Sequence, residues 1–173
     1  MRAERAEIYW HGFVAGLVGY ATIAIAVAVA NLILGRSPFH TAALLGQALF
    51  YGLRDPSQLT IWPGPVLAYN GLHLLVLLGL GVFASWLAYL SERGPHFWYI
   101  GVIMMFFVMF HLFGLYLFAS EPIRSALSPW ALVAGGFAAM STMSVYLVRV
   151  HPRLRAEFRD FAALDPDLKD DER

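Results

Sequence analysis

The chain contains no cysteine, and only 14% of its 173 residues are charged. The missing cysteines exclude disulfides, thiolate metal sites and a cysteine nucleophile. Charged residues make up about 25% of an ordinary soluble domain, so this chain could not cover such a surface with charge. Lys and Arg balance Asp and Glu at 12 each, which excludes a strongly basic nucleic-acid binder.

Apolar sequence is abundant, because 59% of the residues are hydrophobic. A helix needs about 20 apolar residues to cross a bilayer core of about 30 Å. Four segments reach that length, and no charge interrupts them before Arg149 at the end of the last one. Lipid offers no partner to backbone polar groups, so such segments must be helical. We predict an all-α membrane protein, a bundle of four transmembrane helices at about 9–34, 66–90, 97–118 and 130–150.

The positions of Lys and Arg predict the orientation of these spans. Nine of the 12 belong to the N-terminus, the 91–95 turn and the C-terminal segment, whereas the other side holds only Arg36, Arg54 and Arg124. Cytoplasmic loops carry the excess of positive charge. We therefore expect both termini in the cytoplasm and the 35–65 loop outside.

The 35–65 loop contains a further apolar stretch. Ser37 followed by Pro38 is typical of a helix start, because a hydroxyl can cap the first turn and proline fits its first position. The expected helix, at about 38–51, is too short to cross a bilayer. We predict a short interfacial helix on the outer side, either sealing the bundle or forming a lid over a pocket.

Residues 152–173 are expected to form a separate cytoplasmic segment after a transmembrane domain at 1–151. Its first half interleaves arginine with apolar residues at helical spacing, and its last nine residues are mostly acidic. Such a helix suits an anionic lipid surface. The predicted lipid-facing basic patch consists of Arg149, Arg153, Arg155 and Arg159.

The end of the first span and the loop after it form a recognisable pattern. Gly35-Arg36-Ser37-Pro38-Phe39 is followed by the apolar stretch 41–50. Together with the order of spans over 16–152, this resembles small four-span bacterial membrane proteins of unknown function. The resemblance implies a bacterial inner-membrane setting, and it implies no particular activity.

Two histidines are the strongest candidates for a functional site. His73 lies about seven residues into the second span, and His111 lies about seven residues before the end of the third. Antiparallel neighbours would bring both to the same depth in the outer leaflet, pointing into the bundle. Two facing imidazoles between helices could ligate a haem b. The edges of its cavity would then be Gly114, Gly135 and Gly136.

A structural role for the histidines is the alternative that the sequence favours. A buried imidazole can hydrogen-bond within the bundle, and Asn70, one turn from His73, is the first candidate partner. Methionines in the third and fourth spans could contribute to a copper site, but methionine also fills apolar cores. No cofactor, metal site or catalytic residue is therefore the first expectation, with haem b as the alternative.

Small residues in the first span predict a close helix contact. Gly12 and Gly16 are four residues apart and Gly19 lies near them, which lets two backbones approach. This seam could pack within the monomer or against another copy or subunit.

The sequence thus favours a non-enzymatic membrane protein, an accessory or structural subunit of a larger membrane assembly such as a respiratory or photosynthetic complex. Its expected partners are membrane lipids and other subunits or further copies of itself, and no nucleic acid. A bis-histidine haem b protein for electron transfer is one alternative. A small oligomeric channel or carrier, with a polar path past Asn31, Asn70 and the histidines, is the other.

Overall fold

The computed structural model of this chain describes residues 2–91, 114, 120–152 and 155–156. Within these residues it contains helices and no strands. The elements are α1 (Arg2–Ile33), α2 (His40–Phe50), the 3₁₀ turn η1 (Pro56–Gln58), α3 (Pro63–Ser91), α5 (Glu121–Ala126) and α6 (Pro129–Val150).

Three helices of the described chain are long and apolar enough to cross a membrane. Their apolar portions are Ala6–Ile33, Pro63–Leu90 and Pro129–Val150. Even the shortest, 22 residues, extends about 33 Å at 1.5 Å per residue, which exceeds a bilayer core of about 30 Å. The length and composition of these helices indicate a helical membrane protein. The predicted third span, 97–118, lies outside the described residues apart from Gly114.

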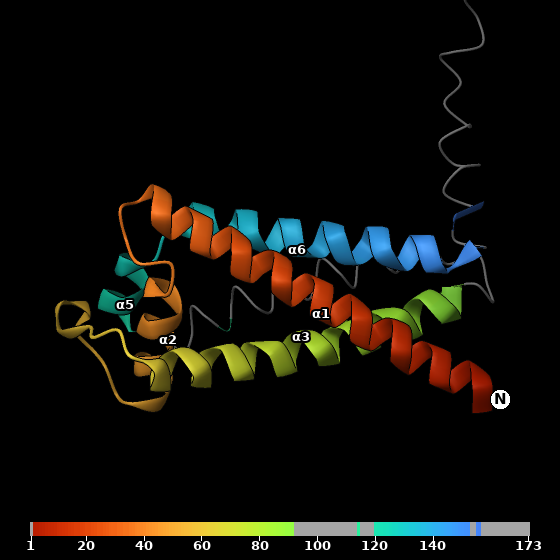
Figure 1. The fold of residues 1–173 in the computed structure, drawn as a ribbon, viewed down its shortest axis with the longest axis horizontal. Helices are drawn as coiled ribbons and strands as arrows, with labels where there is room; N and C mark the ends of the chain where they lie inside the picture. The colour runs from red at the N-terminus through yellow and green to blue at the C-terminus, as the bar shows by residue number, and fades with distance from the viewer. Residues whose placement is uncertain (1, 92–113, 115–119, 153–154, 157–173) are drawn as a thin grey trace, which may run out of the picture.

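Helix α1 lies between α3 and α6 (Figure 1) and makes the most extensive contacts with both. It runs antiparallel to each of them, so that α3 and α6 run in the same direction. The two short helices α2 and α5 lie together at the end of the bundle where α1 ends and α3 and α6 begin. We call this the α2 end.

The crossing of α1 and α3 depends on three glycines. A methyl group added at Gly12 would overlap the Val82 backbone, and one added at Gly16 would overlap the backbone of Leu77 and Leu78. From the other side, a methyl at Gly81 would overlap the backbone of Gly12 and Gly16. Small residues let transmembrane backbones approach each other closely. Gly12 and Gly16 are thus buried by α3 of the same chain.

Small residues also fit α6 against α1. Gly19 faces the Met143 side chain, and Ala15 packs with Ala84 of α3 and Leu147 of α6 in a common buried cluster. The three glycines of α1 in the predicted seam therefore contact different helices. Gly12 and Gly16 pack against α3, and Gly19 packs against Met143 of α6.

A separate apolar core closes the α2 end. Leu44 and Leu45 of α2 are buried against Ile123 of α5 and Leu127, which follows it. Helix α2 lies directly on the start of α3, because a methyl at Gly46 would overlap the backbone of Pro65.

The start of α2 differs from the sequence prediction. The Ser37 hydroxyl accepts a hydrogen bond from the backbone N–H of Phe39 at 3.3 Å, and His40 N–H donates to the Ser37 carbonyl at 2.9 Å. A local turn of this kind competes with helix. The helix therefore begins at His40, two residues later than the pattern of Ser37 and Pro38 indicated.

Helix α5 was not predicted. Ser120 precedes it and Pro122 stands in its first turn, which together are a helix-start signal. Its six residues are too few for apolar periodicity to be read from the sequence. Of the predicted basic patch, Arg149 and Arg155 are exposed, and Arg153 and Arg159 lie outside the described residues.

Candidate ligand cavity

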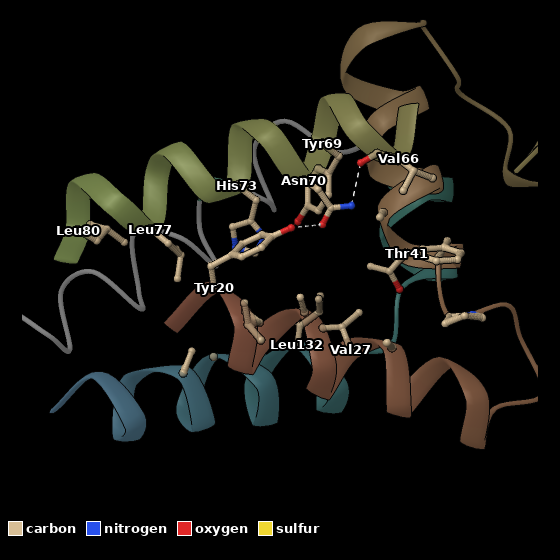
Figure 2. A pocket seen from close by; sticks show the side chains of 18 of the residues that line it. Tyr20, Val27, Thr41, Val66, Tyr69, Asn70, His73, Leu77, Leu80 and Leu132 are labelled. Atoms are coloured by element: carbon tan, nitrogen blue, oxygen red, sulfur yellow. Dashed lines mark hydrogen bonds between the residues drawn. The ribbon is translucent and has the colours of Figure 1, made fainter. Parts of the chain in front are cut away.

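A cavity of about 430 Å³ lies between α1, α3 and α6, with α2 at one end of it (Figure 2). Most of its wall is apolar. Ile23 and Val27 of α1, Leu77 of α3 and Ala139 of α6 are representative. Sites for small organic molecules commonly have volumes of about 300–1,000 Å³ and apolar walls with a few placed polar groups.

Three of the polar residues that line the cavity lie on α3, and one of these three is hydrogen-bonded to Tyr20 of α1. The Tyr20 hydroxyl donates a hydrogen bond to Asn70 Oδ1 at 3.1 Å. Asn70 Nδ2 in turn donates to the Val66 carbonyl one turn earlier in α3, at 2.8 Å. The amide is therefore held in one orientation, with its oxygen toward α1 (Figure 2).

Three aromatic rings meet at the same place. The His73 ring lies nearly perpendicular to that of Tyr20, with centroids 6.2 Å apart, and tilted to that of Tyr69, at 5.5 Å. Edge-to-face and tilted pairs at these separations are favourable arrangements. His73 therefore lies within the bundle and lines the cavity, on the side that the sequence predicted.

Tyr69 is the polar residue of this group that was not predicted as a candidate from the sequence. Its ring is partly buried and lines the cavity. Its hydroxyl makes no hydrogen bond with any residue that the structure describes. The spacing of four between Tyr69 and His73 puts both on one helix face, which is the signal that could have identified it.

The two adjacent glycines of α6 have different surroundings. Gly136 lines the cavity, and a methyl group added there would meet nothing within 4 Å. A methyl at Gly135 would lie 3.3 Å from the Ile23 side chain, so this glycine serves the contact with α1. Of the predicted cavity edges on α6, only Gly136 borders this cavity. Gly114 likewise has nothing within 4 Å of an added methyl group.

A bis-histidine haem needs two imidazoles. The described residues supply one beside this cavity, His73, with Gly136 across from it on α6. His111 lies outside the described residues. No group of three or more metal-ligating His, Asp or Glu side chains occurs in the described part of the chain.

The expected partner of His73 is engaged elsewhere. Both hydrogen-bonding ends of the Asn70 amide contact Tyr20 and Val66, as described above. Asn31, the other asparagine of the spans, is buried near the α2 end, where Thr41 donates to it at 3.1 Å and it donates to the Pro38 carbonyl at 3.3 Å. Asn31 does not line the cavity that Asn70 lines.

A second polar cluster lies at the opposite end of the bundle. His11 Nδ1 is 3.1 Å from the Tyr146 hydroxyl, and the His11 ring lies 6.1 Å from that of His151, edge to face. No role was predicted from the sequence for either histidine. The start of α1 and the end of α6 meet at this end, and only their antiparallel packing reveals the proximity.

Outside the spans, two titratable groups near the α2 end have a lowered pKa, Asp55 because of hydrogen bonds from Ser57, and His40. Burial lowers the pKa of His40, and the positive charge of Arg36 lowers it further. Arg36 itself donates to the Ala126 carbonyl at 3.1 Å, which joins the end of α1 to α5. His40 is therefore neutral at pH 7.

Comparison with protein-family models, curated proteins and solved structures found no match for this chain. The kind of ligand that the cavity suits must therefore be inferred from its lining residues. The arrangement offers an apolar cavity with hydrogen-bonding groups and aromatic rings where α1 faces α3, and no charged side chain among its described lining residues. Such a cavity can bind and orient a neutral molecule.

Proposed function

We propose that this chain is a non-enzymatic, multi-pass protein of a bacterial inner membrane, acting as an accessory or structural subunit of a larger membrane assembly. In this proposal the 97–118 segment completes a four-helix bundle. Both termini face the cytoplasm, and α2 lies in the outer interface.

The proposal rests on one observation: polar side chains inside the spans form hydrogen bonds between helices. Tyr20 bonds to Asn70, Thr22 lies 3.1 Å from Thr142, and His11 lies 3.1 Å from Tyr146. Each pair joins α1 to α3 or to α6. Interhelical hydrogen bonds of this kind stabilise a bundle. These polar groups therefore support a fixed scaffold more than a reaction or a pathway.

The outer faces of the helices support association within a membrane. Ile25 of α1 is 65% exposed, Leu75 of α3 is 68% exposed and Phe137 of α6 is 66% exposed. Apolar faces of this kind are compatible with lipid and with the helices of another subunit. A scaffold without chemistry of its own acts through such contacts.

In-cell photocrosslinking tests the proposal. A benzoylphenylalanine is placed at Phe137 of α6, and a matched control is placed at Leu44, which is fully buried in the α2-end core. We expect Phe137 to yield an adduct with one defined membrane protein, and Leu44 to yield none. Adducts with lipid alone from Phe137, Leu75 and Ile25 would contradict the subunit role.

A bis-histidine haem b protein is the second candidate, because His73 lines a cavity whose opposite wall has a glycine with open space, Gly136. His73 and His111 would hold the iron, and the haem would supply one-electron chemistry. The visible absorption spectrum of the purified chain distinguishes the candidates. A Soret band that is lost in His73→Ala would favour the haem protein over the accessory subunit.

The channel alternative needs a polar path. The described wall of the cavity is mainly apolar, and Asn31 is engaged with Thr41 and Pro38 away from it. These observations favour binding over conduction.

A further inference from the structure

We propose that the cavity between α1, α3 and α6 binds a neutral, membrane-soluble quinone, with its ring against Tyr69 and His73 and its apolar tail along α3 and α6. This proposal goes beyond the accessory role, and it stands or falls independently of any partner subunit.

Polar side chains are unevenly distributed around the cavity. Most of the polar side chains that line the cavity lie on α3, and Tyr20 faces them from α1. The rest of the α1 wall and the α6 wall are apolar, with Val27 and Ala139 among their residues. No described lining residue carries a charge. A phosphate or carboxylate headgroup would therefore lack a counter-charge, whereas a carbonyl oxygen needs only a hydrogen-bond donor.

One hydroxyl on the α3 wall, that of Tyr69, is available to donate a hydrogen bond to a ligand. The Tyr20 hydroxyl is used by Asn70, and the Asn70 amide is fixed by Tyr20 and Val66. The Tyr69 hydroxyl has no such partner among the described residues. A hydroxyl that lines an apolar cavity gains by donating to an acceptor, and a quinone carbonyl entering the cavity supplies one.

Three planar rings border the cavity close to one another. The ring of Tyr69 lies 5.5 Å from that of His73, and the ring of Tyr20 lies 6.2 Å from it. Figure 2 shows Tyr69 and His73 on the cavity face of α3 and Tyr20 across from them on α1. Planar rings accommodate another planar ring by stacked or edge contacts. A flexible acyl chain would use none of this geometry.

The cavity also has an apolar extension that could hold the tail of a quinone. Beyond His73, the wall continues with Leu77 and Leu80 on α3 and with Met140 and Met143 on α6. Methionine adapts its shape to irregular apolar partners. The volume of about 430 Å³ is in the usual range for an organic ligand.

Photolabelling of the full chain tests this proposal. The protein is placed in phosphatidylcholine nanodiscs, illuminated with an azido-substituted decylquinone and mapped by mass spectrometry. We expect labels on the cavity faces of α3 and α6, from Tyr69 to Leu77 and near Gly136. Unlabelled decylquinone should compete, and decylbenzene, which has the ring and tail without carbonyls, should not.

Two variants and a control locate the site. Gly136→Leu should fill the cavity without a backbone clash and reduce labelling at least about tenfold. Gly79→Leu makes the same change at an exposed α3 position with nothing within 4 Å, so it should label like the parent chain. Tyr69→Phe removes one hydrogen bond and should weaken competition by decylquinone roughly threefold to tenfold.

Three results would overturn the proposal. They are equal competition by decylbenzene, unchanged labelling of Gly136→Leu, and a haem Soret band in the purified chain, which would assign the cavity to another occupant. If Gly136→Leu fails to fold, Tyr69→Phe decides, and unchanged decylquinone competition in that variant overturns the proposal.

Discussion

The Tyr20 hydroxyl and the Asn70 side-chain oxygen lie 3.1 Å apart and join α1 to α3 beside the cavity. Asn70 is held in turn by the Val66 carbonyl. This relay places a hydrogen bond between two of the long apolar helices. It also fixes the wall on which His73 and Tyr69 lie.

Removing the Tyr20 hydroxyl tests the strength of this tie. Tyr20→Phe should lower the free energy of unfolding in detergent micelles by about 0.5–1.5 kcal/mol, the usual scale for interhelical hydrogen bonds in membranes. The control is Tyr9→Phe at a residue 62% exposed near the start of α1, which should change the unfolding free energy by less than about 0.5 kcal/mol. Equal effects of both variants would show that the Tyr20–Asn70 bond contributes nothing specific.

The glycine crossing of α1 and α3 should tolerate no side chain. Gly81→Ala forces the two backbones apart, because its methyl group would overlap those of Gly12 and Gly16. We expect a loss of about 1–3 kcal/mol in the free energy of unfolding, as for other overpacked cores. Gly79→Ala, two residues away in open space, should be neutral or stabilising by up to about 1 kcal/mol because alanine favours helix. A neutral Gly81→Ala in equilibrium unfolding would disprove the close crossing.

Single cysteines test the orientation, since the chain has none of its own. Asp55→Cys, exposed in the loop after α2, should react with a membrane-impermeant maleimide from outside intact cells. Glu7→Cys, exposed at the other end of α1, should react only after the cells are opened. The reverse pattern would invert the proposed topology.

The lowered pKa of His40 predicts a pH effect with a definite sign. Its folded-state pKa is below the usual value of about 6.5, because of burial and then of Arg36. The unfolded chain therefore binds the proton more readily. Stability is complete above about pH 6.5 and decreases as the pH falls from there to the folded pKa.

An NMR titration of the His40 imidazole measures this shift directly. We expect a pKa below 6.5 in the parent chain and a rise in Arg36→Gln, which removes the repelling charge. Arg54→Gln, at an exposed position that makes no contribution to the shift, should leave the pKa unchanged. A parent pKa at or above 6.5 would contradict the structure.

The apolar spans could be predicted from sequence because length and hydropathy dictate a spanning helix. Helix α5 could not, since six residues show no periodicity and Ile123 is stabilised by α2, far away in sequence. The start of α2 was misplaced because a local Ser37 turn and a helix cap have the same sequence signal. The proposed orientation and the four-span count stay predictions.

The cavity was predicted only in part. His73 was named as a haem ligand from its polarity and its place in the span, and Gly136 as an edge of the haem cavity. Both residues line the cavity, and their roles toward a haem stay predictions. Tyr20 was missed because its relation to Asn70 depends on how α1 crosses α3, which a single sequence does not encode locally. The proximity of His11 and His151 was missed for the same reason.

Native mass spectrometry of the protein released from its own membranes tests the central claim most directly. The account predicts that the 19.3 kDa chain is found in a stoichiometric complex with at least one different membrane subunit. Release of only the single chain, or only of multiples of its mass, in a detergent that preserves known membrane complexes would contradict a role as an accessory subunit.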